Sequence, residues 1–97
     1  MYIVSFLPSA TKDILQIEES LSFQSYQAEE KFTNNIEKIE KLLTMYPFMY
    51  PIYEDDVYFR QAVLVYQYCL FYHVDEKNKN IFIHRILHSM RDISELI

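Results

Sequence analysis

The sequence predicts an α+β domain in which a helical hairpin packs on one face of a small, antiparallel-dominated sheet. Three observations give this prediction: a short strand-like run at the N-terminus, two amphipathic helical patterns, and a set of apolar, β-branched and aromatic runs in the second half. The expected order is β-α-α-β-β-β, followed by a short C-terminal helix. With 97 residues and 51% hydrophobic content, residues 1–97 suit one domain with its own core.

The first half begins with a strand and continues with two helices. MYIVSFL is a short β-rich run, after which Pro8 and Ser9 offer a strand exit and a helix N-cap. Apolar residues then recur with helical spacing in two stripes, and Asp13 falls among the residues expected to face water. Pro47 ends the second helix, and a short connection near Phe23 indicates an antiparallel hairpin. The stripes are Ala10, Ile14, Ile17 and Leu21, then Ala28, Phe32, Ile36, Ile39 and Leu43.

The second half reads as sheet. After the aromatic connection YPFMYPIYEDD we expect strands at residues 57–65, 68–74 and 81–87, the last two joined by a turn at residues 75–80. No obvious turn residue separates the first two of these strands. Because the chain has no glycine, tight turns are expected to use Asn and Asp, which tolerate a positive φ. Ser89 and Asp92 have the spacing of a capping box and predict a final helical turn.

Composition excludes several classes of function. Phosphate-binding Walker and Rossmann loops need glycine, so no nucleotide cofactor is expected, and no other cofactor is indicated. A net charge of −5 and a pI near 5.0 argue against broad binding to nucleic acid. No apolar run has transmembrane length and no secretory signal is recognisable, so we expect a cytoplasmic protein without a membrane partner. The single Cys69 lies in an apolar run and is expected to pack in the core.

Few side chains in the second half suggest a site. Arg60 either contacts a target or pairs with the acidic stretch at residues 54–56, which is otherwise expected to be solvated. Tyr68 and Tyr72 alternate with apolar residues on one strand face, which favours packing over chemistry.

The C-terminal run IFIHRILHSMRD carries the remaining candidates. His84 and His88 are expected on the same strand face, but four strand residues span roughly 13 Å, too far for one metal ion, so no metal site is predicted. His88 suits a structural hydrogen bond at the end of the strand, with acid/base chemistry as the alternative. Arg91 is a candidate functional cation or a turn-stabilising residue, and Asp92 is a candidate helix cap.

Three phrases, FLPSATKDILQIE, FRQAVLVYQYCLFYHVD and IFIHRILHSMRD, together resemble the RelE/ParE superfamily of small toxins over nearly the whole chain. The matching positions are Pro8, Ala10, Asp13, Arg60, Tyr68, Tyr72, His88, Arg91 and Asp92. The resemblance implies the toxin of a type II toxin-antitoxin, or plasmid addiction, module that is neutralised by a cognate antitoxin from the same operon.

The superfamily has two activities, and the departures from its patterns matter here. RelE-like members cleave messenger RNA on the ribosome with a set of basic residues, whereas ParE-like members inhibit DNA gyrase without that set. Cys69 stands where RelE-like nucleases usually carry an arginine. A second basic position falls near Met90, although a shift of one residue would place Arg91 there. The resemblance therefore favours a ParE-like toxin that acts by protein contact. An endoribonuclease built from Arg60, His88 and Arg91, or an inactive relative that only binds antitoxin, remains the alternative.

Antitoxin binding is common to these alternatives. A disordered segment covers apolar surface by docking as a helix or by adding a strand. The candidate contact residues for antitoxin or target are Phe48, Tyr50, Tyr53 and Arg91, with packing in the core as an equal alternative for the three aromatic residues.

Overall fold

The computed structural model describes residues 1–89 and 92–96, and it confirms the predicted α+β class and element order. Two 3-10 turns, η1 (Val65–Gln67) and η2 (Ile93–Leu96), accompany the main elements, and the expected C-terminal helix is the second of them. The main elements are β1 (Ile3–Phe6), α1 (Pro8–Ser22), α2 (Tyr26–Met45), β2 (Arg60–Val63), β3 (Tyr68–Asp75) and β4 (Asn80–His88).

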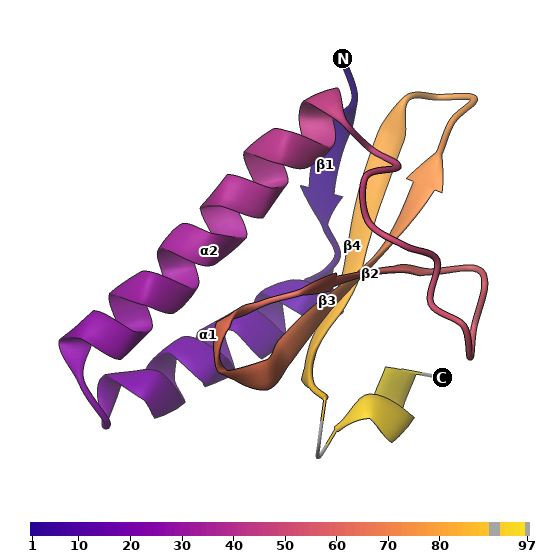
Figure 1. The fold of residues 1–97 in the computed structure, drawn as a ribbon. Coiled ribbons are helices and arrows are strands. Elements are labelled where there is room, and N and C mark those ends of the chain that lie inside the picture. The colour runs from indigo at the N-terminus through magenta and orange to yellow at the C-terminus, as the bar shows by residue number, and fades with distance from the viewer. Residues whose placement is uncertain (90–91, 97) are drawn as a thin grey trace.

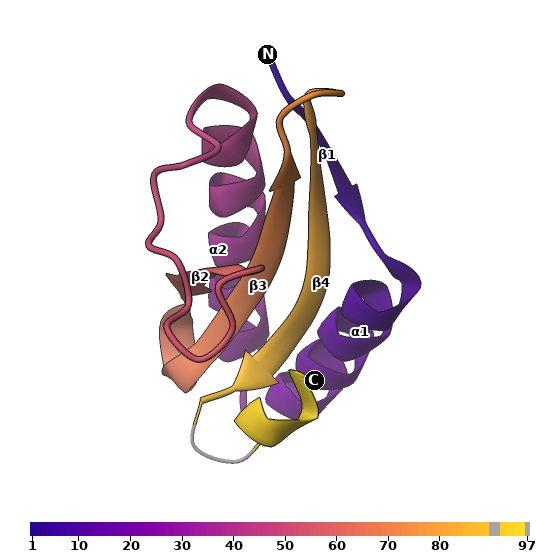
Figure 2. The ribbon, with the colours of Figure 1, turned by 90° about the vertical axis from the view of Figure 1, so that its right-hand side faces the viewer.

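The four strands form one mixed sheet in the order β1-β4-β3-β2. β1 runs parallel to β4, whereas the β4–β3 and β3–β2 pairs are antiparallel. Both helices lie on one face of this sheet, as the two views in Figures 1 and 2 show. The stripes predicted for the two helices meet alternate side chains of the strands in the main core.

The opposite face of the sheet has a smaller cover. The connection at residues 46–59 and the turn η2 close over a second cluster that contains Phe59, Cys69, Phe71, Leu87 and Leu96. Cys69 is a free, buried thiol in this cluster, as expected from its apolar surroundings. Residues on β3 thus alternate between two apolar clusters, which explains why this strand reads as a continuous apolar run.

The start of α1 differs from the prediction. Leu7 holds the N-cap position, makes no side-chain cap, and is followed by Pro8 in the first turn. Ser9 lies inside the helix, where its Oγ donates to the carbonyl of His84 on β4 at 2.7 Å. At α2 the cap is conventional, because the Ser25 Oγ accepts from the Ala28 N–H at 3.0 Å.

The strand predicted at residues 57–65 is shorter in the structure, where β2 spans Arg60–Val63. It begins late because residues 53–59 form hydrogen bonds with one another. The Tyr53 N–H donates to the Phe59 carbonyl at 2.8 Å, and the Phe59 N–H donates to the Asp56 carbonyl at 3.0 Å. These bonds use backbone groups that would otherwise join the sheet. Regular pairing with β3 therefore starts only at Arg60, which lies opposite Tyr72.

The turns do not use Asn or Asp at their left-handed positions, contrary to the prediction. Tyr66 and Gln67, at φ 60° and 64°, form the tight link between β2 and β3, and Lys79 has φ 58° in the next hairpin. Two successive positive φ values are typical of a type I′ turn, which matches the twist of the flanking strands. The requirement of the hairpin outweighs the cost of about 1 kcal/mol or more that each such residue incurs.

Candidate functional site

Arg60 lies at the start of β2, beneath the aromatic connection. Its Nη1 donates to the carbonyl of Tyr50 at 2.7 Å and to that of Phe48 at 3.4 Å, and its guanidinium lies 5.0 Å from the centre of the Phe48 ring. The pairing with residues 54–56 that the sequence allowed is not formed. Two of these carboxylates accept hydrogen bonds within the connection instead, Asp55 from the Tyr53 hydroxyl and Asp56 from the Tyr58 N–H.

The candidate contact residues of the connection are divided between surface and core. Phe48 is 46% exposed, whereas Tyr50 packs against the main core and Tyr53 against the second cluster. Around Phe48 further large apolar side chains are exposed, including Met49, Ile52, Val57 and Tyr58. The structure therefore leaves an apolar surface here, although only part of it comes from the residues singled out in the sequence.

Tyr68 and Tyr72 have the packing role that alternation predicts. Both are buried in the main core, and the Tyr72 hydroxyl donates to the Pro47 carbonyl at 2.9 Å. Burial raises the pKa of Tyr72 to about 12. This phenol stays protonated at neutral pH and fixes the exit from α2 to the sheet.

An ion pair that the sequence did not predict joins α1 to β4. Asp13, expected to face water, is buried and holds Arg85 through two bonds, Nε to Oδ2 at 2.7 Å and Nη2 to Oδ1 at 3.1 Å. The hydrogen bond to Asp13 raises the pKa of Arg85. The sequence does indicate this burial, because Asp13 stands three residues after Ala10 and four before Ile17, inside the buried stripe.

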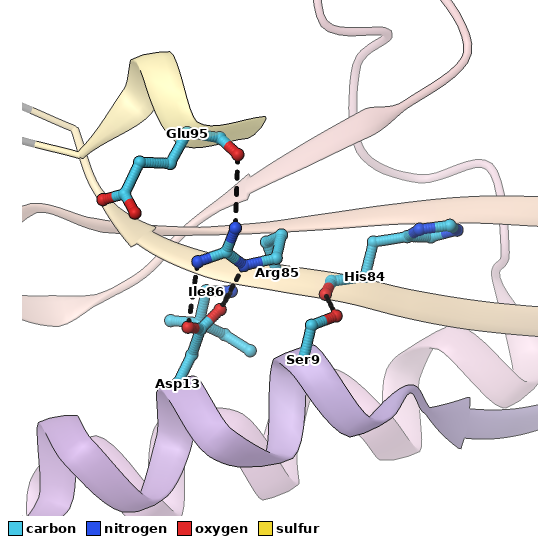
Figure 3. Close-up of polar contacts among 6 residues, drawn as sticks. All are labelled: Ser9, Asp13, His84, Arg85, Ile86 and Glu95. Carbon is cyan, nitrogen blue, oxygen red and sulfur yellow. Dashed lines mark hydrogen bonds and ion pairs between the residues drawn. The ribbon is translucent and has the colours of Figure 1, made fainter. Parts of the chain in front are cut away.

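Side chains of α1 continue the hydrogen bonding of β4 where β1 stops. β1 pairs with β4 only as far as Ile83, and the next polar contacts come from Ser9 to the His84 carbonyl and from the Ile86 N–H to Asp13 at 3.0 Å. Arg85 extends the group by donating to the Glu95 carbonyl in η2 at 3.2 Å. Figure 3 shows this arrangement, which covers the edge of β4 and fastens the C-terminal turn.

The histidines do not share a strand face, contrary to the expectation. The register between β3 and β4 shifts after Phe71, and His84 is the additional residue of the resulting bulge. His84 consequently contacts Phe59 on the second face, with ring centroids 5.0 Å apart, whereas His88 contacts Tyr68 at 5.2 Å. Burial lowers the pKa of His84, and the neighbouring His73 lowers it further.

The structure places two of the candidate catalytic residues, Arg60 and His88, apart from each other. Arg60 lies opposite Tyr72 and His88 opposite Tyr68, so four residues of β3, roughly 13 Å, separate their positions along that strand. Arg91 lies outside the described residues. Among residues 1–89 and 92–96, no group of three or more His, Cys, Asp or Glu side chains is placed to hold a metal ion.

A family model described as the ParE toxin of the type II toxin-antitoxin system parDE matches residues 4–93. The chain belongs to this ParE toxin family. No curated protein matches the sequence.

Membership in the ParE toxin family confirms the resemblance to the RelE/ParE superfamily and its ParE-like side. The chain is thus a type II toxin-antitoxin toxin, and the family implies a cognate antitoxin as its partner. In the part of the chain that is described, no helix has the length and apolar character needed to span a bilayer.

Proposed function

We propose that this chain inhibits DNA gyrase by direct protein contact and is neutralised by an antitoxin encoded with it. The observation that carries the proposal is the ParE toxin family match, which spans residues 4–93. In a bacterial cytoplasm such a pair would stabilise the plasmid or chromosomal region that encodes it. Neither step needs a metal ion or a cofactor.

The arrangement of cations supports contact rather than RNA cleavage. Cleavage without a metal requires a base, an acid and a cation directed at one phosphate. Arg60 and His88 stand apart on the sheet, and Arg85 is bound to Asp13. None of these three is positioned with another around a common point on the described surface.

The apolar surface around residues 46–59 supports the antitoxin half of the proposal. Phe48, Met49 and Ile52 are each nearly half exposed, and Val57 is 74% exposed. Contiguous apolar exposure of this kind usually marks a protein contact. A disordered antitoxin segment would bury these side chains, and Tyr50 and Tyr53 would support them from below.

Growth after inducible expression of the chain alone tests the function. Optical density is followed in a bacterial culture that also carries a DNA-damage reporter, and a chain truncated before β2 serves as the control. Arrest with the reporter on is the expected result, because blocked gyrase leaves broken DNA.

Arrest with a silent reporter would overturn the gyrase target and favour the ribosome-dependent nuclease. In that case His88→Ala and Arg91→Ala should abolish messenger cleavage while the fold is kept. Normal growth with abundant folded protein would instead favour a relative that only binds antitoxin.

A further inference from the structure

A cleft of about 290 Å³ opens at the edge of the sheet beside Arg60. β3 extends three residues beyond its last pair with β2, so His73, Val74 and Asp75 have no strand neighbour on that side. The aromatic connection bends over this uncovered edge. The cleft is walled mainly by the apolar side chains Phe48, Ile52, Val57, Tyr58 and Val74.

The walls of the cleft are held in place by contacts beneath them. The Tyr58 ring stacks on His73, with centroids 4.2 Å apart and an interplanar angle of 7°. Phe48 is fixed between Tyr2, at a ring-centroid distance of 6.4 Å, and the Arg60 guanidinium. The cleft is therefore preformed, which lowers the entropic cost of filling it.

Arg60 supplies a positive charge that the described chain does not neutralise. Within residues 1–89 and 92–96, its hydrogen bonds go to two neutral carbonyls, both through Nη1, and no carboxylate lies at ion-pair distance. The nearest acidic residues in sequence, Asp55 and Asp56, accept from their own turn. Nε and Nη2 are the donors that a carboxylate could use in the forked geometry typical of arginine.

From this charge and these walls we infer that the cleft binds an extended segment of the antitoxin in which an aspartate or glutamate stands next to a bulky apolar residue. The carboxylate pairs with Arg60, and the apolar side chain lies among Phe48, Ile52, Val57 and Tyr58. Apolar walls around one cation select this combination over a purely apolar or a basic segment. The inference rests on the toxin-antitoxin function proposed above and names the chemistry of the partner.

The test uses two synthetic peptides, acetyl-EFEL-amide and its neutral counterpart acetyl-QFQL-amide. Each is titrated into the ¹⁵N-labelled full chain while amide shifts of Phe48, Tyr58 and Val74 are followed by NMR. We expect the acidic peptide to shift these amides and to bind about fivefold more tightly than the neutral one, the ratio for an exposed charge pair near 1 kcal/mol. The preference should fall with added salt.

Two variants test whether Arg60 is the source of the preference for the acidic peptide. Arg60→Gln should remove the preference for the acidic peptide, and Lys41→Gln, which removes one exposed charge from α2, should leave it unchanged. Because the peptide comparison is made on the unmutated chain, it stands even where Arg60→Gln perturbs the connection.

Equal binding of both peptides, or no shift with either, would overturn the inference. Shifts of the same amides on raising the protein concentration alone would also overturn it, because a second copy would then occupy the cleft. Each of these results leaves the growth assay for toxicity untouched, so the two proposals fail separately.

Discussion

Two arginines on the strands that flank β3 have opposite surroundings. Arg85 on β4 is held by the carboxylate of Asp13 and by the Glu95 carbonyl, so its charge is compensated within the chain. Within the described residues, Arg60 on β2 is bound by the carbonyls of Phe48 and Tyr50 and contacts the Phe48 ring, and it has no carboxylate partner. The first lies in the polar group between α1 and η2, and the second faces an apolar cleft.

This difference indicates that Arg85 stabilises the fold, whereas Arg60 is available to bind a carboxylate of a partner. A compensated, partly buried ion pair contributes to folding mainly because breaking it leaves a charge without its partner. A cation that meets only neutral carbonyls can gain a carboxylate from a partner without giving up an internal one. We therefore expect substitutions near Arg85 to affect stability and substitutions of Arg60 to affect binding.

The largest effect on stability is expected for Asp13→Asn. This change breaks the pair with Arg85 and weakens the acceptor of the Ile86 N–H. Removing one partner of a fully buried pair costs about 3–5 kcal/mol, and because Arg85 keeps 25% side-chain exposure we expect about 2 kcal/mol. Urea unfolding measures it, with the exposed Glu19→Gln on the same helix as control. A loss as small as that of the control would show that the pair contributes nothing.

The second-largest loss of stability is expected for Tyr72→Phe, which leaves the buried Pro47 carbonyl without its hydrogen-bond donor. The expected loss is about 1 kcal/mol. The pKa of Tyr72 is about 12 in the folded chain against 10.0 for an unperturbed tyrosine, so the unfolded chain gives up this proton first. Stability should fall as pH rises from 10 to about 12, and Tyr72→Phe should reduce that slope. An unchanged slope in the variant would assign the alkaline loss to other groups.

A smaller change in folding stability is expected as the pH falls below 7, and it comes from His84. The pKa of His84 lies below 6.5 in the folded chain, so below pH 6.5 the unfolded chain binds this proton more readily and stability falls as pH decreases. His73 contacts His84 and Tyr58 and adds to the same repulsion, and the Asp75 carboxylate interacts with His73 in the opposite sense. His84→Phe keeps the aromatic contacts with Phe59 and should flatten the slope between pH 7 and 5. A slope equal to that of the unmutated chain would exclude His84 as its source.

The smallest effect on stability is expected for Arg60→Gln, about 0.5 kcal/mol, because one of its bonds to the carbonyls is exposed and the other only partly buried. Arg85→Gln is the matched comparison and should cost several times more. Chemical denaturation of both variants measures the contrast. Equal losses would remove the distinction between the two arginines.

Much of the fold was predictable because it follows from periodicity. The stripes of α1 and α2 and the alternation on β3 depend on which side chains avoid water, and the sequence carries that information directly. The boundaries of β2 depended instead on backbone bonds within residues 53–59, and the turn at Tyr66 and Gln67 depended on sheet twist. Neither leaves a residue pattern in the sequence.

The site was predictable only in part. Arg60 and Phe48 were recognised as candidates, but their contact required the connection to fold back over the sheet edge. His84 and His88 lie on different faces because of one bulge residue, which alternation alone cannot reveal. Asp13 was misassigned because a carboxylate in an apolar stripe was read as solvated, whereas its partner lies 72 residues away on β4.

The most direct measurement of the contrast is hydrogen exchange at the two arginine Nε–H groups, followed by ¹⁵N NMR in the unmutated chain. The Nε–H of Arg85 is bonded to Asp13 at 2.7 Å and should exchange slowly at neutral pH. Among the residues that the structure describes, Arg60 donates through Nη1 alone, so its Nε–H should exchange at nearly the rate of free arginine and slow when the acidic peptide binds. Equal protection of both groups in the free chain would contradict the account, because Arg60 would then already have an internal partner.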